Sequence, residues 1–177
     1  MNKKNEKKIV KIAEREVSKF VKEWKKYPYL WDSETDVHGE LYVRIKGALE
    51  HLDKTTHCYK KYMNKEARFE RVYCNPLTYI KKGERYHPDI VIYEGSGFND
   101  GDKKVNEPML WVCEIKYKTQ WGNDQSEINR KYDKRKLRIL LRQQANPEIR
   151  GTKYAYFLEL VRTKEKALPD HGPVELK

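Results

Sequence analysis

Two short apolar runs that carry charged residues constrain the fold of this chain more than any other feature. They span residues 87–93 (HPDIVIY) and 110–116 (LWVCEIK), and a polar stretch rich in Gly, Asn and Asp separates them. Each run has the length of a β-strand, in which side chains alternate between two faces. Glu114 and Lys116 therefore share one face, about 6.6 Å apart at roughly 3.3 Å per residue. A register exists in which Asp89 lies beside Glu114.

Three charged side chains on adjoining apolar strands need an explanation, because a desolvated carboxylate is costly unless it is paired or holds a cation. Carboxylate oxygens are ligands that favour Mg²⁺ or Mn²⁺. A lysine beside such a cation can hold the water molecule that attacks a phosphate. The residues thus indicate a metal-dependent phosphodiesterase site. The simpler alternative is that Asp89 is a turn residue after Pro88 and that Glu114 and Lys116 form an ion pair on an exposed strand face.

The positive charge of the chain is concentrated in two segments. The 177 residues carry a net charge of +11. Residues 1–26 hold ten basic and four acidic side chains, and residues 130–142 hold seven basic and one acidic. These two segments together carry +12, so the rest of the chain is close to neutral. Localised positive charge is typical of a surface that binds a phosphate backbone, although two solvated helix faces would give the same pattern.

Cysteine content and hydropathy indicate the cellular compartment in which we expect the protein. Cys58, Cys74 and Cys113 are odd in number and show no C-x-x-C spacing, so neither a disulfide framework nor a zinc site is indicated. The N-terminus lacks an apolar signal core, and no run approaches the ~20 apolar residues of a membrane span. We therefore expect a cytoplasmic protein with no membrane contact.

Apolar residues recur at helical spacing in three segments. The first is residues 5–26, which Pro28 ends; the second begins after Asp32 or Ser33 and runs to about residue 53; the third is residues 125–144. Ser33 with Asp36 three residues later has the form of a helix N-cap. Trp24, Tyr27, Tyr29 and Trp31 form an aromatic group between the first two helices, which we expect to join them rather than to stack on bases.

Strand patterns lie between and after these helices. Besides the two charged runs, alternation predicts strands at residues 67–73 and 154–161 and allows one at 57–62. The tail, residues 163–177, has too little apolar content to predict structure. The chain is therefore expected to form one α/β domain over residues 1–177, with a mixed central β-sheet flanked by α-helices.

The order of these elements and their motifs resembles the PD-(D/E)xK nuclease superfamily. The motif residues are Pro88-Asp89 and Glu114-x-Lys116, set in two apolar strands. Residues 33–37 (SETDV) also resemble the first-helix signature of restriction-enzyme-like members, and residues 132–137 (YDKRKL) a D-x-x-K-L helix of several relatives. The resemblance covers residues 32–161 and implies a restriction-endonuclease-like core. Residues 1–28 are then an extra N-terminal helix.

The resemblance also implies roles for individual residues. Asp89 and Glu114 would bind the metal, Mg²⁺ or alternatively Mn²⁺, and Lys116 would position or activate the attacking water. An acid of the second helix would complete the site as a catalytic and metal-binding residue. Glu34 is preferred, because it shares the helical stripe of the apolar residues. Glu40 lies to one side of that stripe and stays open as the alternative metal ligand.

The expected partner is DNA, with RNA as the alternative, and a homodimer through the first helix is one of the expected states. The basic residues that follow the catalytic strand most closely are the expected contacts to phosphate: Lys131, Lys134, Arg135 and Arg138. The predicted function is magnesium-dependent hydrolysis of DNA, in restriction, repair or a mobile element. Two rivals use the same fold without catalysis: a nucleic-acid-binding protein, and a subunit that binds another protein through its first helix.

Overall fold

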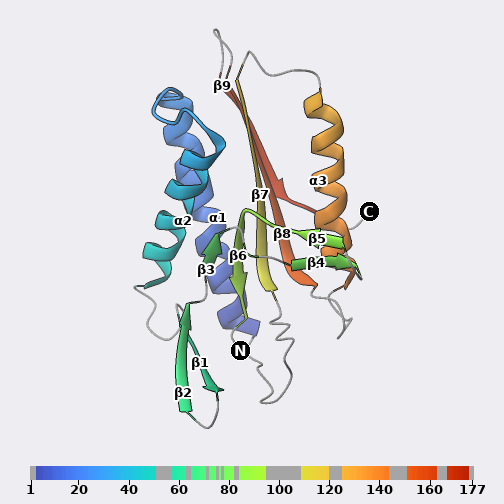
Figure 1. The fold of residues 1–177 in the computed structure, drawn as a ribbon. Helices are drawn as coiled ribbons and strands as arrows, with labels where there is room; N and C mark the ends of the chain where they lie inside the picture. The colour runs from blue at the N-terminus through green and yellow to red at the C-terminus, as the bar shows by residue number, and fades with distance from the viewer. Residues whose placement is uncertain are drawn as a thin grey trace.

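The structure is a computed structural model that describes residues 3–50, 57–62, 65–70, 72–74, 76, 78–81, 84–94, 109–119, 125–143, 151–162 and 167–175. Within these ranges the chain forms three α-helices and nine β-strands. Five of the strands build one mixed sheet, and helices lie on both of its faces (Figure 1). The prediction of an α/β fold with a mixed central sheet flanked by helices is therefore confirmed.

Helices α1 (Lys3–Lys26) and α2 (Glu34–Glu50) pack side by side on one face of the sheet (Figure 1). The apolar stripe of α1 is buried along its length, with Ile9, Phe20 and Trp24 fully covered. Leu41 and Ile45 of α2 are buried in the same core. Both helices thus form as the 3.6-residue period predicts, and packing of the apolar stripes holds them on the sheet.

The connection between α1 and α2 fixes where α2 begins. Trp31 is buried and packs its ring against Phe20, with ring centroids 4.8 Å apart, while Tyr29 is exposed. Ser33 caps the helix as predicted: its Oγ accepts the Asp36 N–H at 3.1 Å, and Asp36 Oδ2 accepts the Ser33 N–H at 2.9 Å. Glu34 is consequently held in the first turn of α2.

The central sheet has the order β3-β6-β7-β8-β9. All neighbours are antiparallel except β7 and β8, which run parallel. A parallel pair needs a crossover connection, and helix α3 (Gln125–Arg142) lies between β7 and β8 in the chain and covers the second face (Figure 1). The strands are β3 (Val72–Cys74), β6 (Ile90–Tyr93), β7 (Met109–Thr119), β8 (Thr152–Arg162) and β9 (Ala167–Pro173).

Alternation along the strands divides the core into two halves. Trp111, Cys113 and Ile115 of β7 pack with α1 and α2 on one face. Met109 and Val112 belong to the other half, where α3 contributes Leu137 and Leu140. Residues Met109 to Ile115 are all buried, because helices cover both faces of this central strand. A charged residue such as Glu114 is therefore held in surroundings that exclude most water.

The structure differs from the sequence expectations in three places. The tail forms β9, an antiparallel edge strand on β8, where no structure was expected. The strand expected over residues 67–73 divides into β2 (Lys65–Glu70), which pairs with β1 (His57–Tyr62), and β3 in the central sheet. A further hairpin that was not expected joins β4 (Thr78–Lys81) and β5 (Glu84–Tyr86). None of the described helices combines the length and hydrophobicity that crossing a bilayer requires.

Candidate functional site

The candidate site lies along one edge of β7. On this edge β6 pairs with β7 only as far as Cys113, whereas β8 follows the other edge to the end of the strand. Side chains accept the N–H groups beyond that point: Ile115 N donates to Asp89 Oδ2 at 2.6 Å, and Tyr117 N donates to Glu34 Oε2 at 3.1 Å. Two carboxylates, one preceding β6 and one from the first turn of α2, thus take the place of a neighbouring strand.

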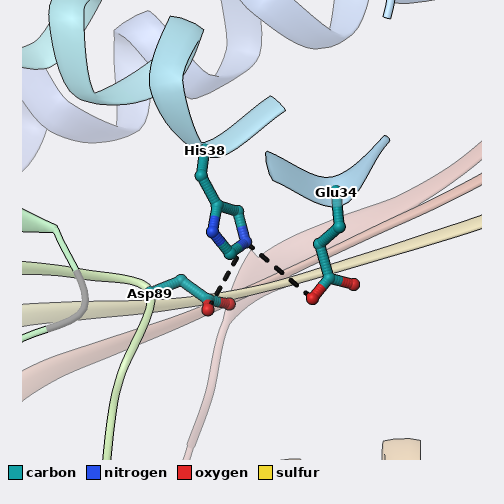
Figure 2. Close-up of side chains that lie close together, drawn as sticks. All are labelled: Glu34, His38 and Asp89. Carbon is teal, nitrogen blue, oxygen red and sulfur yellow. Dashed lines mark ion pairs between the residues drawn. The ribbon is translucent and has the colours of Figure 1, made fainter. Parts of the chain in front are cut away.

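The other oxygens of these two carboxylates face His38. Its Nε2 lies 3.4 Å from Asp89 Oδ1 and 4.0 Å from Glu34 Oε1, and Figure 2 shows the imidazole pointing toward both. One ligand atom from each of the three residues lies within 4.8 Å of the others. His38 Nε2 is buried, yet it makes no hydrogen bond within the described residues. A buried nitrogen that makes no hydrogen bond within the described residues, beside two carboxylate oxygens, fits a divalent cation at this position.

Glu114 lies next to this group but has its own partners. Its Oε2 accepts a hydrogen bond from the Tyr86 hydroxyl at 2.5 Å, and its Oε1 lies 3.3 Å from Lys116 Nζ. Burial, and then the charge of Asp89, raise the pKa of Glu114 to about 7, although Lys116 acts in the opposite direction. Burial and the contact with Glu114 also raise the pKa of Tyr86 well above its ordinary value, so this phenol remains a hydrogen-bond donor.

Lys116 connects the acids of the three layers. Its Nζ lies 3.7 Å from Glu34 of α2, 3.3 Å from Glu114 of β7 and 3.5 Å from Asp133 of α3. Burial alone would lower the pKa of Lys116, but the surrounding carboxylates outweigh burial and hold this pKa above its ordinary value. Asp133 is buried and also pairs with Lys136, at 3.0 Å. The ammonium group of Lys116 is therefore charged at neutral pH and held by several partners.

The structure brings together the four residues that the sequence assigned to catalysis: Asp89, Glu114, Lys116 and Glu34. The alternative acid, Glu40, contacts residues other than those of this cluster. Its Oε1 accepts a hydrogen bond from Arg44 Nε at 2.5 Å, and Arg44 also donates to Glu23 of α1 at 2.7 Å. The contacts of Glu40 described by the structure thus belong to the seam between the two helices.

The basic residues expected to contact phosphate lie in different surroundings along α3. Lys131 and Arg135 are exposed. Lys134 is 3.5 Å from Asp170 of β9 and lies over the ring of Phe157, 4.5 Å from its centroid. Arg138 lines a small pocket beside β9 together with Lys134. Half of this predicted set is therefore turned toward β9 rather than toward open solvent.

Three residues of the cluster were not assigned a role from the sequence: His38, Tyr86 and Asp133. His38 follows Glu34 by four residues, a spacing that places two side chains on the same helix face. Asp133 is the acid of the D-x-x-K-L pattern, but the sequence alone did not show that α3 turns it toward Lys116. Tyr86 precedes the Asp89 run and carried no comparable signal.

Comparison with known proteins adds no family to this geometry. The chain matches no protein-family model, no curated protein and no solved structure.

Proposed function

We propose that this protein is a divalent-metal-dependent nuclease that hydrolyses phosphodiester bonds, with DNA as the preferred substrate. The observation that carries the proposal is the meeting of Asp89, Glu114, Lys116 and Glu34 at the open edge of β7. Beside them lies the buried His38 Nε2, which makes no hydrogen bond to any residue that the structure describes. Acids that can hold a metal and an ammonium group beside them, in one partly dry site, are components that metal-dependent phosphodiester hydrolysis can use.

The fold supports the same proposal. From α2 to β8 the order helix, three strands of the central sheet, helix, strand agrees with the restriction-endonuclease-like core that the motifs suggest, apart from the inserted hairpins β1-β2 and β4-β5. Asp89 lies immediately before β6 and the E-x-K sequence lies within β7, which supports the proposal. Fold likeness alone would leave the chemistry open, so the proposal depends on the side chains.

Asp89 Oδ1, Glu34 Oε1 and His38 Nε2 would hold the cation. When bound, a divalent cation supplies an activated water and offsets the negative charge that grows on the phosphate. The imidazole helps to identify the cation. Carboxylates suit both Mg²⁺ and Mn²⁺, whereas an imidazole nitrogen is a ligand of transition metals. The inclusion of His38 therefore favours Mn²⁺, the alternative of the two cations expected from the sequence.

The remaining residues act on the substrate and on one another. Lys116 is charged at neutral pH, so it can donate hydrogen bonds to the attacking water or to a phosphate oxygen. Asp133 and Glu114 hold that ammonium from two sides. Tyr86 in turn holds Glu114 by donating to its Oε2. Each of these contacts restricts a reacting group to one position before substrate arrives.

The test is cleavage of labelled single-stranded, duplex and branched DNA, and of RNA, with Mg²⁺, with Mn²⁺ and with chelator. We expect metal-dependent cleavage that Asp89→Asn and Lys116→Gln each reduce by about 100-fold or more, the loss typical for removal of a charge-stabilising group. Glu40→Gln is the matched control, since Glu40 contacts Arg44 instead of the cluster. Thermal melting of each variant separates loss of chemistry from loss of fold.

Two outcomes would contradict the proposal. Cleavage that persists at the wild-type rate in both site variants would belong to a contaminant or to another site. Binding of nucleic acid without cleavage under any metal condition would instead support a non-catalytic nucleic-acid-binding protein, in which Asp89 and Glu34 only complete the edge of β7.

A further inference from the structure

A second feature of the molecule is an open groove of about 1030 Å³ between α1 and α2. Its described lining residues all belong to these two helices, and six of them form a basic row along α1: Lys4, Lys7, Lys8, Lys11, Arg15 and Lys19. The α2 residues that line it include Val43 and Gly47, on a different side of that helix from the buried Leu41 and Ile45. The groove therefore opens away from the sheet and is separate from the cluster around Asp89.

Most of the positive charge in this groove is not neutralised. Glu16 is the acid among the described lining residues, and it already bridges Arg15 at 3.1 Å and Lys19 at 2.9 Å. Arg44, on the opposite wall, is paired with two acids as described above. Four exposed lysines of α1 are left, and within the part of the chain that the structure describes they form no ion pair: Lys4, Lys7, Lys8 and Lys11.

The spacing of these charges identifies the kind of partner. Lys4, Lys8 and Lys11 follow one another at one helical turn, about 5.4 Å. The row from Lys4 to Lys19 extends for about 22 Å at roughly 1.5 Å per residue, which is long enough to follow several phosphates of one strand. A regularly repeated positive charge complements a regularly repeated negative charge. We expect such a row to match the backbone of a nucleic acid, in which every nucleotide carries a phosphate.

We propose that the groove between α1 and α2 binds the phosphodiester backbone of a nucleic acid, at a site distinct from the candidate metal cluster. The contacts are ionic and independent of base sequence, because lysine ammonium groups interact with phosphates and not with a pattern of base edges. In the molecule as a whole, the groove holds a portion of the strand that is remote from the residues around Lys116. Its role is retention of nucleic acid, whether or not that nucleic acid is cut.

The experiment measures affinity for labelled oligonucleotides over a salt series, in chelator, so that no cleavage takes place. Each phosphate contact contributes about 0.9 to the slope of log K against log salt for duplex DNA, and about 0.7 for a single strand. The variant Lys7→Gln/Lys11→Gln should weaken binding and reduce the slope by about one such contribution for each lysine that contacts phosphate. Lys7→Arg/Lys11→Arg should restore both affinity and slope.

Lys25→Gln/Lys26→Gln is the matched control, because it removes the same charge from the same helix outside the groove. It should leave the slope near that of the wild type. DNA and RNA, single-stranded and duplex, are compared to identify which backbone the groove accepts. Equal slopes for the wild type and the groove variant would overturn the proposal, and so would equal losses in the groove variant and its control, which would reflect net charge alone.

A third result against the groove would be binding of polyglutamate as tight as that of the oligonucleotide, because the site would then accept any polyanion, including an acidic protein. Failure of this proposal is distinguishable from failure of the proposed nuclease activity. A flattened salt slope without cleavage in Mn²⁺ or Mg²⁺ would retain the groove and remove the nuclease. Metal-dependent cleavage by the wild type, together with a salt slope that is the same in the groove variant, would retain the nuclease and remove the groove.

Discussion

Asp89 and Glu34 each perform two tasks with two oxygens. One oxygen of each accepts an N–H from the edge of β7, and the other faces His38. The backbone bonds fix both side chains and so hold the second oxygen of each near His38, where Glu34 Oε1 also lies 3.7 Å from Lys116 Nζ. The same arrangement explains why an amide substitution is more informative than alanine: the one oxygen of asparagine or glutamine can still accept the N–H, while an uncharged NH2 group, which cannot bind a cation, replaces the second oxygen.

The two acids of α2 should therefore differ when they are changed to glutamine. Glu34→Gln keeps an acceptor for Tyr117 N but removes a charge beside Lys116 and His38, so we expect a weaker metal affinity and a slower cleavage rate. Glu40→Gln disturbs only the pairing with Arg44 and should leave both close to the wild type. Isothermal titration with Mn²⁺ and single-turnover cleavage measure the two effects. A larger loss of metal affinity and cleavage rate in Glu40→Gln than in Glu34→Gln would assign the metal to another face of α2.

Glu114 should make the stability of the metal-free protein depend on pH. Its pKa is about 7 in the folded protein against an ordinary value of 4.5, so between these pH values the folded state binds more protons than the unfolded state. The free energy of unfolding should then fall as pH rises through this window, by up to ~1.4 kcal/mol per pH unit from this group. Below about pH 4.5 the contribution is fully retained.

The comparison is between wild type and Glu114→Gln, both melted in chelator from pH 4.5 to 8. The glutamine cannot titrate, so the difference in free energy of unfolding between the two proteins should change across the window in favour of the variant. Parallel curves for the two proteins would mean that the carboxyl of Glu114 ionises at its ordinary pH despite its burial.

At the scale of elements, the sequence predicted best what depends on local period. The three helices and the charged strands follow from repeating apolar positions, and Ser33 with Asp36 marks the start of α2. Strand β9 escaped prediction because it contains Pro169 and Pro173 and few apolar residues. It forms because β8 offers a free edge, where proline is tolerated. Pairing of this kind is set by the tertiary structure and leaves little trace in the segment itself.

The same distinction applies to the site. Alternation placed Glu114 and Lys116 on one face, and helical phase favoured Glu34 over Glu40, which agrees with where these side chains lie. Neither the strand alternation nor the helical period specifies how a helix is rotated when it packs, and therefore which of its side chains point toward the sheet. The positions of His38 and Asp133, and the pairing of Lys134 with Asp170 of β9, depend on that packing.

The cap of α2 should couple helix stability to the site. Ser33→Ala removes the acceptor for the Asp36 N–H immediately before Glu34, and loss of such a cap costs about 1 kcal/mol. We expect the free energy of unfolding to fall by that amount in urea denaturation and Mn²⁺ affinity to weaken, because the first turn of α2 is less fixed. Ser33→Thr, which retains a hydroxyl that accepts the Asp36 N–H and donates to the Asp36 carboxylate, should recover both. Loss of stability with unchanged metal affinity would separate the cap from the site.

At the scale of the molecule, α2 contributes to both of the proposed functional surfaces. Its sheet-facing side carries Glu34 and His38, and another side forms a wall of the basic groove. The basic residues of α3 lie on the opposite face of the sheet. A short rigid duplex cannot contact both faces simultaneously. Binding of nucleic acid in the groove and binding by α3 would therefore be separate contributions to affinity, which variants in the two helices can measure one at a time.

A bound cation would also join elements from different parts of the chain, since its proposed ligands come from α2 and from the residue before β6. A ligand that binds only the folded state stabilises it by about 2.7 kcal/mol at a concentration 100 times its dissociation constant. For a chain of this length, that amount raises the melting temperature by roughly 5–10 °C.

We expect Mn²⁺ to produce such a shift in the wild type and in Glu40→Gln, and chelator to abolish it. In His38→Ala the shift should largely disappear at the same Mn²⁺ concentration. Because each protein is compared with its own metal-free form, any intrinsic destabilisation of the variant cancels, and an undiminished shift in His38→Ala would place the cation away from this imidazole.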